Sequence, residues 1–142
     1  MDAKLIKQHN LPWNELELAF DLDDAKTVRD VRKKVGEHFD SYAKYVEELV
    51  QPEATLANLT EAKQFTEAEK KRMFALYRRL MFLQRLSLEV GIDNDEKKDA
   101  QFLKESLSEW TQLKPEIKAI FSKLKEAWSG DSDAKEEAEY FG

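Results

Sequence analysis

Hydrophobic residues recur at helical spacing along most of the chain, and the densest stretch runs from Thr66 to Gly91. Thr66 and Glu69 have the spacing of a capping box, in which the hydroxyl and the carboxylate each accept a hydrogen bond from the other residue's amide. Gly91 stands where a glycine commonly ends a helix. The pattern therefore predicts a helix over residues 67–90 at the centre of the fold.

The apolar side chains of this helix span roughly 200° of a helical wheel, about twice the width expected of a surface helix. Six of them form a broad face and four lie at its flanks. The broad face holds Met73, Leu76, Tyr77, Leu80, Leu83 and Val90, and the flanks hold Phe74, Met81, Leu86 and Leu88. We expect this helix to contact other elements on two or three sides.

A second long helix is predicted over about residues 24–50, capped by Asp23 or Asp24 and ended before Pro52. Its apolar residues follow a seven-residue repeat typical of a helix-packing seam. The repeat consists of Val28, Val35, Tyr42 and Leu49. Gly36 interrupts this helix at a cost of up to ~1 kcal/mol, so it either marks the close approach of another helix or has no structural role.

A third long helix is predicted over about residues 95–129, with Asp93 as its cap and Gly130 as its end. Leu103, Trp110, Ile117 and Leu124 repeat every seven residues. The repeat continues through Pro115 in a single phase. We therefore expect one helix kinked near Pro115 rather than two separate helices.

The segment before these helices has a different pattern, because apolar and polar residues alternate from Glu15 to Asp23. Alternation is typical of a strand with one buried face, yet no second strand-like segment exists to pair with it. Three structures satisfy these residues. The segment is a helix, since Glu, Leu and Ala favour one; it is an extended strap over the bundle; or it pairs with its own copy in a dimer.

These elements define an all-α fold, an elongated bundle of three long antiparallel helices with an N-terminal strap or short helices over residues 1–23. Residues 1–129 form a single domain, and residues 130–142 are expected to be an acidic, disordered tail. The 37% of charged residues, with four glycines and three prolines in 142 residues, also favours helix over sheet.

The composition bears on the cellular location of the protein and on whether it is anchored in a membrane. The chain has no cysteine, which excludes disulfides and thiolate chemistry. Its first residues lack the basic and apolar regions of a signal peptide. The longest apolar run of the central helix, Leu80 to Leu83, is far short of the ~20 residues that span a bilayer. We expect a cytoplasmic protein without a membrane anchor.

The net charge of −6 is unevenly distributed. Residues 13–24 carry five acids and no base, and residues 130–142 carry five acids and one lysine, so the remainder of the chain has a net charge of +3. The predicted central helix is itself basic. The bundle is therefore a moderately basic body with two acidic appendages.

No catalytic or cofactor motif is visible in the sequence. His9 and His38 lie outside the E-x-x-H and H-x-x-x-H spacings of di-iron and zinc sites. The acids from Asp93 to Asp99 lack the glycine and the final glutamate of a calcium loop. We therefore expect no catalytic residue, no bound cofactor and no metal.

The sequence instead suggests a protein that binds a partner. Phe82 sits among charged residues on the polar face of the central helix, where it is either covered by another segment or contacts a second chain or ligand. The candidate partner-binding residues are Phe82, Arg78, Arg85, Lys71, Tyr140 and Phe141. We predict a non-enzymatic helical interaction protein that binds another protein or self-associates.

The alternative function is binding of nucleic acid or another polyanion. Phosphate contacts need clustered bases, and the central helix supplies Lys70, Lys71, Arg72, Arg78, Arg79 and Arg85. An isoelectric point of about 5.1 disfavours this alternative, and the acidic appendages can neutralise the same bases.

Overall fold

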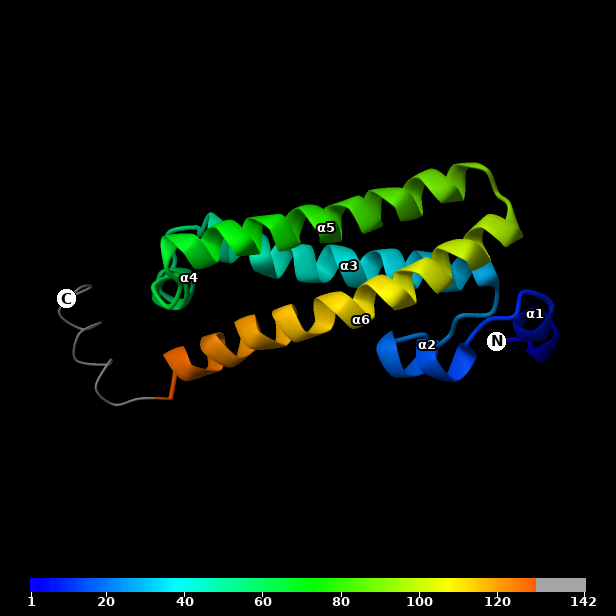
Figure 1. Ribbon diagram of the computed structural model, residues 1–142, viewed down its shortest axis with the longest axis horizontal. Coiled ribbons are helices and arrows are strands. Elements are labelled where there is room, and N and C mark those ends of the chain that lie inside the picture. Colours follow the sequence, from blue (N-terminus) through cyan, green and yellow to red (C-terminus); the bar gives the residue numbers. More distant parts are fainter. Residues whose placement is uncertain (130–142) are drawn as a thin grey trace.

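Three long helices form the body of the protein in the structure, a computed structural model that describes residues 1–129 (Figure 1). They are α3 (Val28–Val50), α5 (Glu67–Ile92) and α6 (Glu96–Ala127). α5 runs antiparallel to both α3 and α6 (Figure 1), and the described residues contain no strand. The all-α bundle predicted from the sequence is therefore confirmed. The predicted tail, residues 130–142, lies outside the described residues.

Three short helices complete the fold. α1 (Ala3–Gln8) and α2 (Trp13–Ala19) precede α3, and α4 (Leu56–Ala62) lies between α3 and α5. α1 and α4 lie toward opposite ends of the bundle, and α2 packs beside α6 (Figure 1). The N-terminal segment therefore covers α6 and α3 and leaves α5 at the edge of the molecule.

The alternating segment is a helix followed by an extended strap, so two of the three sequence interpretations each describe a part of it. In α2, Leu16 is fully buried while Leu18 is 87% exposed, as expected when alternating residues fall on a helix. Phe20 then adopts an extended conformation, and the side chains of Phe20 and Leu22 are both buried. Intermolecular pairing as a strand is excluded for residues 13–19.

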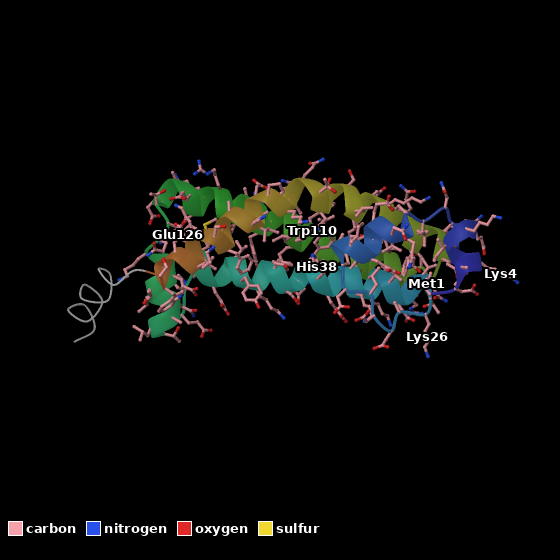
Figure 2. All side chains as sticks on the ribbon, turned by 90° about the horizontal axis from the view of Figure 1, so that it is seen from below. Met1, Lys4, Lys26, His38, Trp110 and Glu126 are labelled. Atoms are coloured by element: carbon pink, nitrogen blue, oxygen red, sulfur yellow. The ribbon has the colours of Figure 1, made fainter. Side chains whose placement is uncertain are left out.

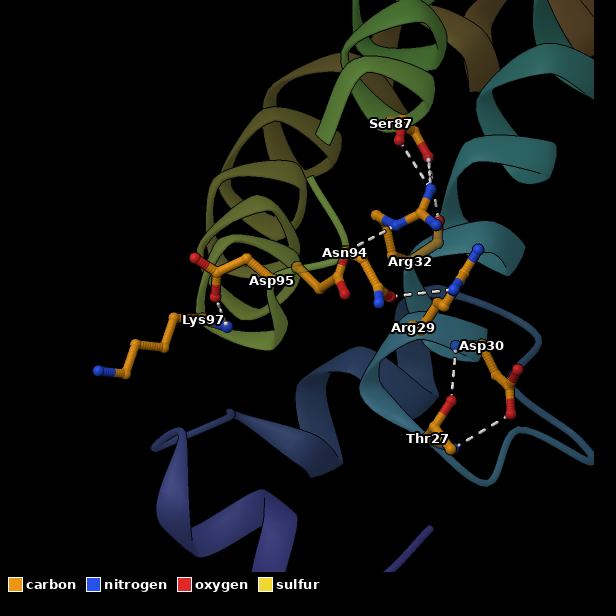
Figure 3. Close-up of polar contacts among 9 residues, drawn as sticks. Thr27, Arg29, Asp30, Arg32, Ser87, Asn94, Asp95 and Lys97 are labelled. Atoms are coloured by element: carbon orange, nitrogen blue, oxygen red, sulfur yellow. Dashed lines mark hydrogen bonds and ion pairs between the residues drawn. The ribbon is translucent and has the colours of Figure 1, made fainter. Parts of the chain in front are cut away.

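α3 begins at Val28, four residues later than predicted, because Thr27 rather than Asp23 or Asp24 is its cap. The Thr27 hydroxyl accepts from the Asp30 amide at 3.0 Å, and the Asp30 carboxylate accepts from the Thr27 amide at 3.1 Å (Figure 3). Asp24 instead takes a positive φ of 67° in the preceding turn. A complete capping box thus satisfies two amides at this end.

The junction of α5 and α6 also differs from the prediction. α5 continues through Gly91 to Ile92, and Asn94 takes the left-handed conformation that turns the chain. Asp95 caps α6 by accepting from the Lys97 amide at 3.0 Å (Figure 3). Asp93, the predicted cap, forms an ion pair with Lys98 at 2.8 Å.

α6 runs without interruption through Pro115, which confirms one continuous helix. Leu103, Trp110 and Ile117 of its seven-residue repeat are buried, and Leu124 is packed against the core. The Thr111 hydroxyl donates to the Leu107 carbonyl at 3.0 Å in the turn before the proline. A kink near Pro115 stays a prediction.

A buried polar junction joins all three long helices. Arg32 of α3 and Asp99 of α6 form an ion pair with Nε and Oδ1 2.7 Å apart, and each side chain is at most 5% exposed. Arg32 Nη1 also donates to the Ser87 carbonyl of α5 at 2.7 Å (Figure 3). Burial raises the pKa of Asp99, and the charge of Arg32 opposes that rise.

An aromatic cluster surrounds the imidazole of His38 in the middle of the bundle (Figure 2). The ring centroid of His38 lies 4.4 Å from Trp110, 4.8 Å from Phe20 and 4.9 Å from Tyr42. Burial among these rings lowers the pKa of His38 to about 4. His38 is therefore neutral in the folded protein at pH 7.

We expect His38 to make the protein lose stability as the pH falls from about 6.5 to about 4. The unfolded chain binds the proton near pH 6.5, whereas the folded protein does so only near pH 4. Protonation thus favours unfolding by about 2 kcal/mol, after a discount for the solvent that reaches the ring.

Urea unfolding of the wild type and of His38→Phe at pH 7 and pH 4 measures this effect. The phenylalanine variant keeps a ring in the cluster and lacks the titrating group, so it should lose less stability than the wild type. Equal losses in the two proteins would show that His38 does not contribute.

Candidate partner-binding face

Large apolar side chains are exposed on the side of α5 that faces away from the bundle. The exposed fractions are 50% for Phe74, 67% for Phe82, 54% for Leu88 and 83% for Ile92. Single apolar residues are common on protein surfaces, but several large ones on one face of a single helix favour an interaction site. We call this surface the outer face of α5.

The outer face follows a heptad pattern of its own. From Phe74 to Ile92 its residues are spaced alternately by four and three positions, as at the a and d positions of a coiled coil. The d positions are Phe74, Met81 and Leu88, and the a positions are Lys71, Arg78, Arg85 and Ile92. At 1.5 Å per residue, the 18-residue rise from Phe74 to Ile92 is about 27 Å long.

The cations of this face have no acidic partner among the described residues. No carboxylate of residues 1–129 lies within 4 Å of the charged nitrogens of Lys71, Arg78 or Arg85. Arg79, the next residue around the helix, is different, because it pairs with Glu109 at 3.3 Å and Glu116 at 3.5 Å. Arg79 thus links α5 to α6, while Arg78 has no carboxylate partner among the described residues.

Two shallow depressions border the outer face. Phe82 and Arg78 line a groove between α5 and α6, together with Glu105 and Glu109. Lys71 and Phe74 line a second depression near the start of α5, beside Val50 at the end of α3. On both sides of the face, a partner's side chains can therefore pack into a depression.

Four of the six candidate residues, Phe82, Arg78, Arg85 and Lys71, thus share one face. The expectation that α5 contacts other elements on at least two sides is confirmed, since it packs against α3 and α6; Phe74 and Leu88, on one flank of its apolar arc, are exposed. No described segment covers Phe82, and the N-terminal segment packs on the other side of the bundle (Figure 1). Tyr140 and Phe141 lie outside the described residues.

Sequence reasoning overlooked that the flanking residues form a separate surface. The helical spacing alone could have identified this surface, because Phe74, Met81 and Leu88 follow each other at seven-residue intervals. Met81 is partly buried against the core. The column of Phe74, Met81 and Leu88 therefore borders both the buried face of α5 and its outer face. Ile92 was overlooked because the helix was expected to end at Gly91.

The titratable Glu69, away from this face, stabilises the start of α5. Glu69 caps α5 through the Thr66 amide at 3.1 Å and forms an ion pair with Lys123 of α6. Its pKa is lowered to about 2, chiefly by the hydrogen bond from Lys123 and then by that from the Thr66 amide. A carboxylate held ionised in this way is a poor general acid or base near neutral pH.

No group of three or more His, Asp or Glu side chains in residues 1–129 is arranged to hold a metal ion. No helix in that range is long and apolar enough to cross a bilayer. No protein-family model matches the chain, and no curated protein or solved structure is significantly similar to it. The outer face of α5 is the candidate functional site of the described residues.

Proposed function

We propose that this protein is a non-enzymatic helical interaction protein that binds another protein through the outer face of α5. The observation that carries the proposal is the exposure of Phe74, Phe82, Leu88 and Ile92 on one face of a single helix. Burial of apolar surface drives most protein association, at roughly 25 cal/mol per Å² before the costs of association. An aromatic residue ringed by arginines has the composition of an interface hot spot.

The spacing of the face favours a helix as the bound element. A four-and-three pattern of a and d positions matches the side-chain packing of a second helix laid along the first. The cations at the a positions favour a partner that supplies acidic side chains. The protein would then act as an adaptor, a small assembly subunit or a self-associating bundle.

Replacement of Phe82 by aspartate is expected to abolish partner binding. A buried aromatic anchor typically contributes about 2 kcal/mol or more, so the variant should retain less than a tenth of the bound partner. The measurement is affinity capture from the source cells, with quantitative mass spectrometry of the captured proteins. Because Phe82 is exposed, the substitution should leave the fold intact, which circular dichroism checks.

Leu18→Asp is the matched control. Leu18 is 87% exposed on α2, away from α5, so this variant should capture the same proteins as the wild type. If Phe82→Asp and Leu18→Asp both capture the wild-type set, the outer face of α5 is not the binding surface.

Polyanion binding remains the second candidate, supported by Lys71, Arg78 and Arg85, which have no acidic partner within residues 1–129. It is weaker because phosphate backbones make no use of the apolar column between these cations, and because Arg79 and Lys70 already pair with acids. Nucleic acid binding at low salt that Arg78→Gln weakens and Phe82→Asp spares would favour this function instead.

A further inference from the structure

We propose that the partner on the outer face of α5 is the same face of a second copy, with the two α5 helices antiparallel. This inference rests on the proposed function and names the partner. The two-fold axis would pass near Leu83, which is the midpoint between Phe74 and Ile92. The observations behind it are the register of the heptad, the distribution of charge along α5, and the position of α5 at the edge of the bundle.

The register is self-complementary only in the antiparallel direction. In antiparallel helix pairs, an a position faces a d position of the other helix. About an axis near Leu83, Phe74 faces Ile92 of the second copy, Arg78 faces Leu88, and Met81 faces Arg85. Arg78 and Arg85 are then each opposite a hydrophobic residue, against which the aliphatic stem of the arginine can pack.

Parallel pairing would place like charges together. Lys71, Arg78 and Arg85 would each face their own copy, and like-charged neighbours destabilise a helix pair. The antiparallel arrangement also opposes the two helix dipoles, so that the positive end of each helix lies beside the negative end of the other.

The charges along α5 are complementary to those of a second α5 helix that runs in the opposite direction. Three cations of the outer face have no acidic partner in residues 1–129, and they precede Glu89 and the acidic turn at residues 93–95; they are Lys71, Arg78 and Arg85. In the proposed register, Arg78 lies beside Glu89 of the second copy, one residue from its facing position. Lys71 lies opposite the acidic turn. The same two contacts occur twice because of the two-fold symmetry.

Phe82 lies closest to the symmetry axis. It occupies the position after the central d residue, and in an antiparallel pair this flanking position faces its own copy. The two Phe82 rings would therefore contact each other across the axis and shield one another from water. Because α5 forms the edge of the described bundle (Figure 1), no described segment lies in the way of a second copy.

A charge exchange tests the register in the full-length chain. Arg78→Glu and Glu89→Arg should each raise the dimer dissociation constant at least tenfold, because each puts like charges at both symmetric contacts. The double variant Arg78→Glu/Glu89→Arg should return to within about threefold of the wild type, since it restores both pairs. Lys33→Glu, on the exposed face of α3, should have no effect. Analytical ultracentrifugation measures all four variants.

Single-cysteine variants test the axis independently, because the chain has no cysteine of its own. Phe82→Cys should form a disulfide-linked dimer under mild oxidation. Leu18→Cys, at a position of α2 that is even more exposed than Phe82, should form no disulfide-linked dimer in the same assay. Oxidation of both variants at equal rates would reflect random collision and would overturn the proposed axis.

The outcomes separate this inference from the proposed function. A wild type that is monomeric at up to about 0.2 mM, but whose cellular partner is lost with Phe82→Asp, overturns self-association and retains the interaction face. A dimer insensitive to Arg78→Glu, or a double variant as weak as the single ones, overturns the antiparallel α5 pairing.

Discussion

Replacing Asp99 by alanine is expected to lower the free energy of unfolding by about 3–5 kcal/mol, because it leaves the buried Arg32 guanidinium without its counter-charge. Arg32 and Asp99 are each at most 5% exposed, with Nε and Oδ1 2.7 Å apart. The hydrogen bond from Arg32 to the Ser87 carbonyl at 2.7 Å would remain. One backbone carbonyl does not compensate for a buried positive charge.

Arg32 stays enclosed in this variant, because Ser87 and Gly91 of α5 both lie against its guanidinium. Its guanidinium lies against Gly91, where an added Cβ would be only 2.8 Å from Nη2. The glycine of α5 thus leaves the space that the guanidinium occupies. The charge would have to be solvated by opening the contact between α3 and α5.

The double variant Arg32→Met/Asp99→Leu is the control for this interpretation. Replacing a whole buried ion pair by apolar side chains of similar size is often neutral or stabilising. The double variant should therefore be more stable than Asp99→Ala, and it tests the idea even if Asp99→Ala fails to fold. Urea unfolding at pH 7 measures both. A loss below about 1 kcal/mol for Asp99→Ala would show that the ion pair is not needed for stability.

The long helices could be predicted because the residue pattern within each segment is enough to identify it as a helix. Seven-residue repeats of apolar side chains placed α3 and α6, and the Thr66–Glu69 capping box located the start of α5 to the residue. Helix ends were less certain where two caps competed. Thr27 and Asp95, rather than nearby aspartates, cap α3 and α6 because they form the capping hydrogen bonds. Those hydrogen bonds depend on the path of the chain into each helix.

The buried junction could not be predicted from the sequence. Arg32 and Asp99 are 67 positions apart, and each lies among charged residues that resemble a solvated helix face. Their pairing depends on how α3 and α6 rotate about their axes when they pack. That rotation is set by the whole core and not by the residues next to either charge.

The candidate site was predicted in part, for a related reason. The sequence singled out Phe82 and the neighbouring cations, but it could not decide which side of a wide apolar arc would be buried. It also could not separate Arg78 from Arg79, since the position of α6 decides that Arg79 pairs with acids of that helix while Arg78 pairs with no acid of the described residues. Spacing identifies a face, and packing decides whether that face is core or surface.

Replacing Gly36 by leucine is expected to lower the free energy of unfolding by about 3 kcal/mol, because α3 and α5 touch at this residue. A Cβ at Gly36 would lie 2.5 Å from Ser87 Oγ and 2.9 Å from Ser87 Cβ. A larger side chain must push the helices apart or force neighbours from their preferred rotamers, which typically costs 1–3 kcal/mol and occasionally more. The glycine in the seam therefore marks a close helix approach.

Graded substitutions separate this steric effect from helix propensity. Gly36→Ala gains up to ~1 kcal/mol of intrinsic helix stability, so a net loss in this variant can come only from contact with Ser87. Ser41→Leu, at an exposed position of the same helix, controls for adding leucine and should change stability little. Unfolding in urea, followed by circular dichroism, ranks the variants. If Gly36→Leu were as stable as Ser41→Leu, α3 and α5 would not be in close contact, and the orientation that turns Phe82 and Arg78 toward solvent would lose its structural basis.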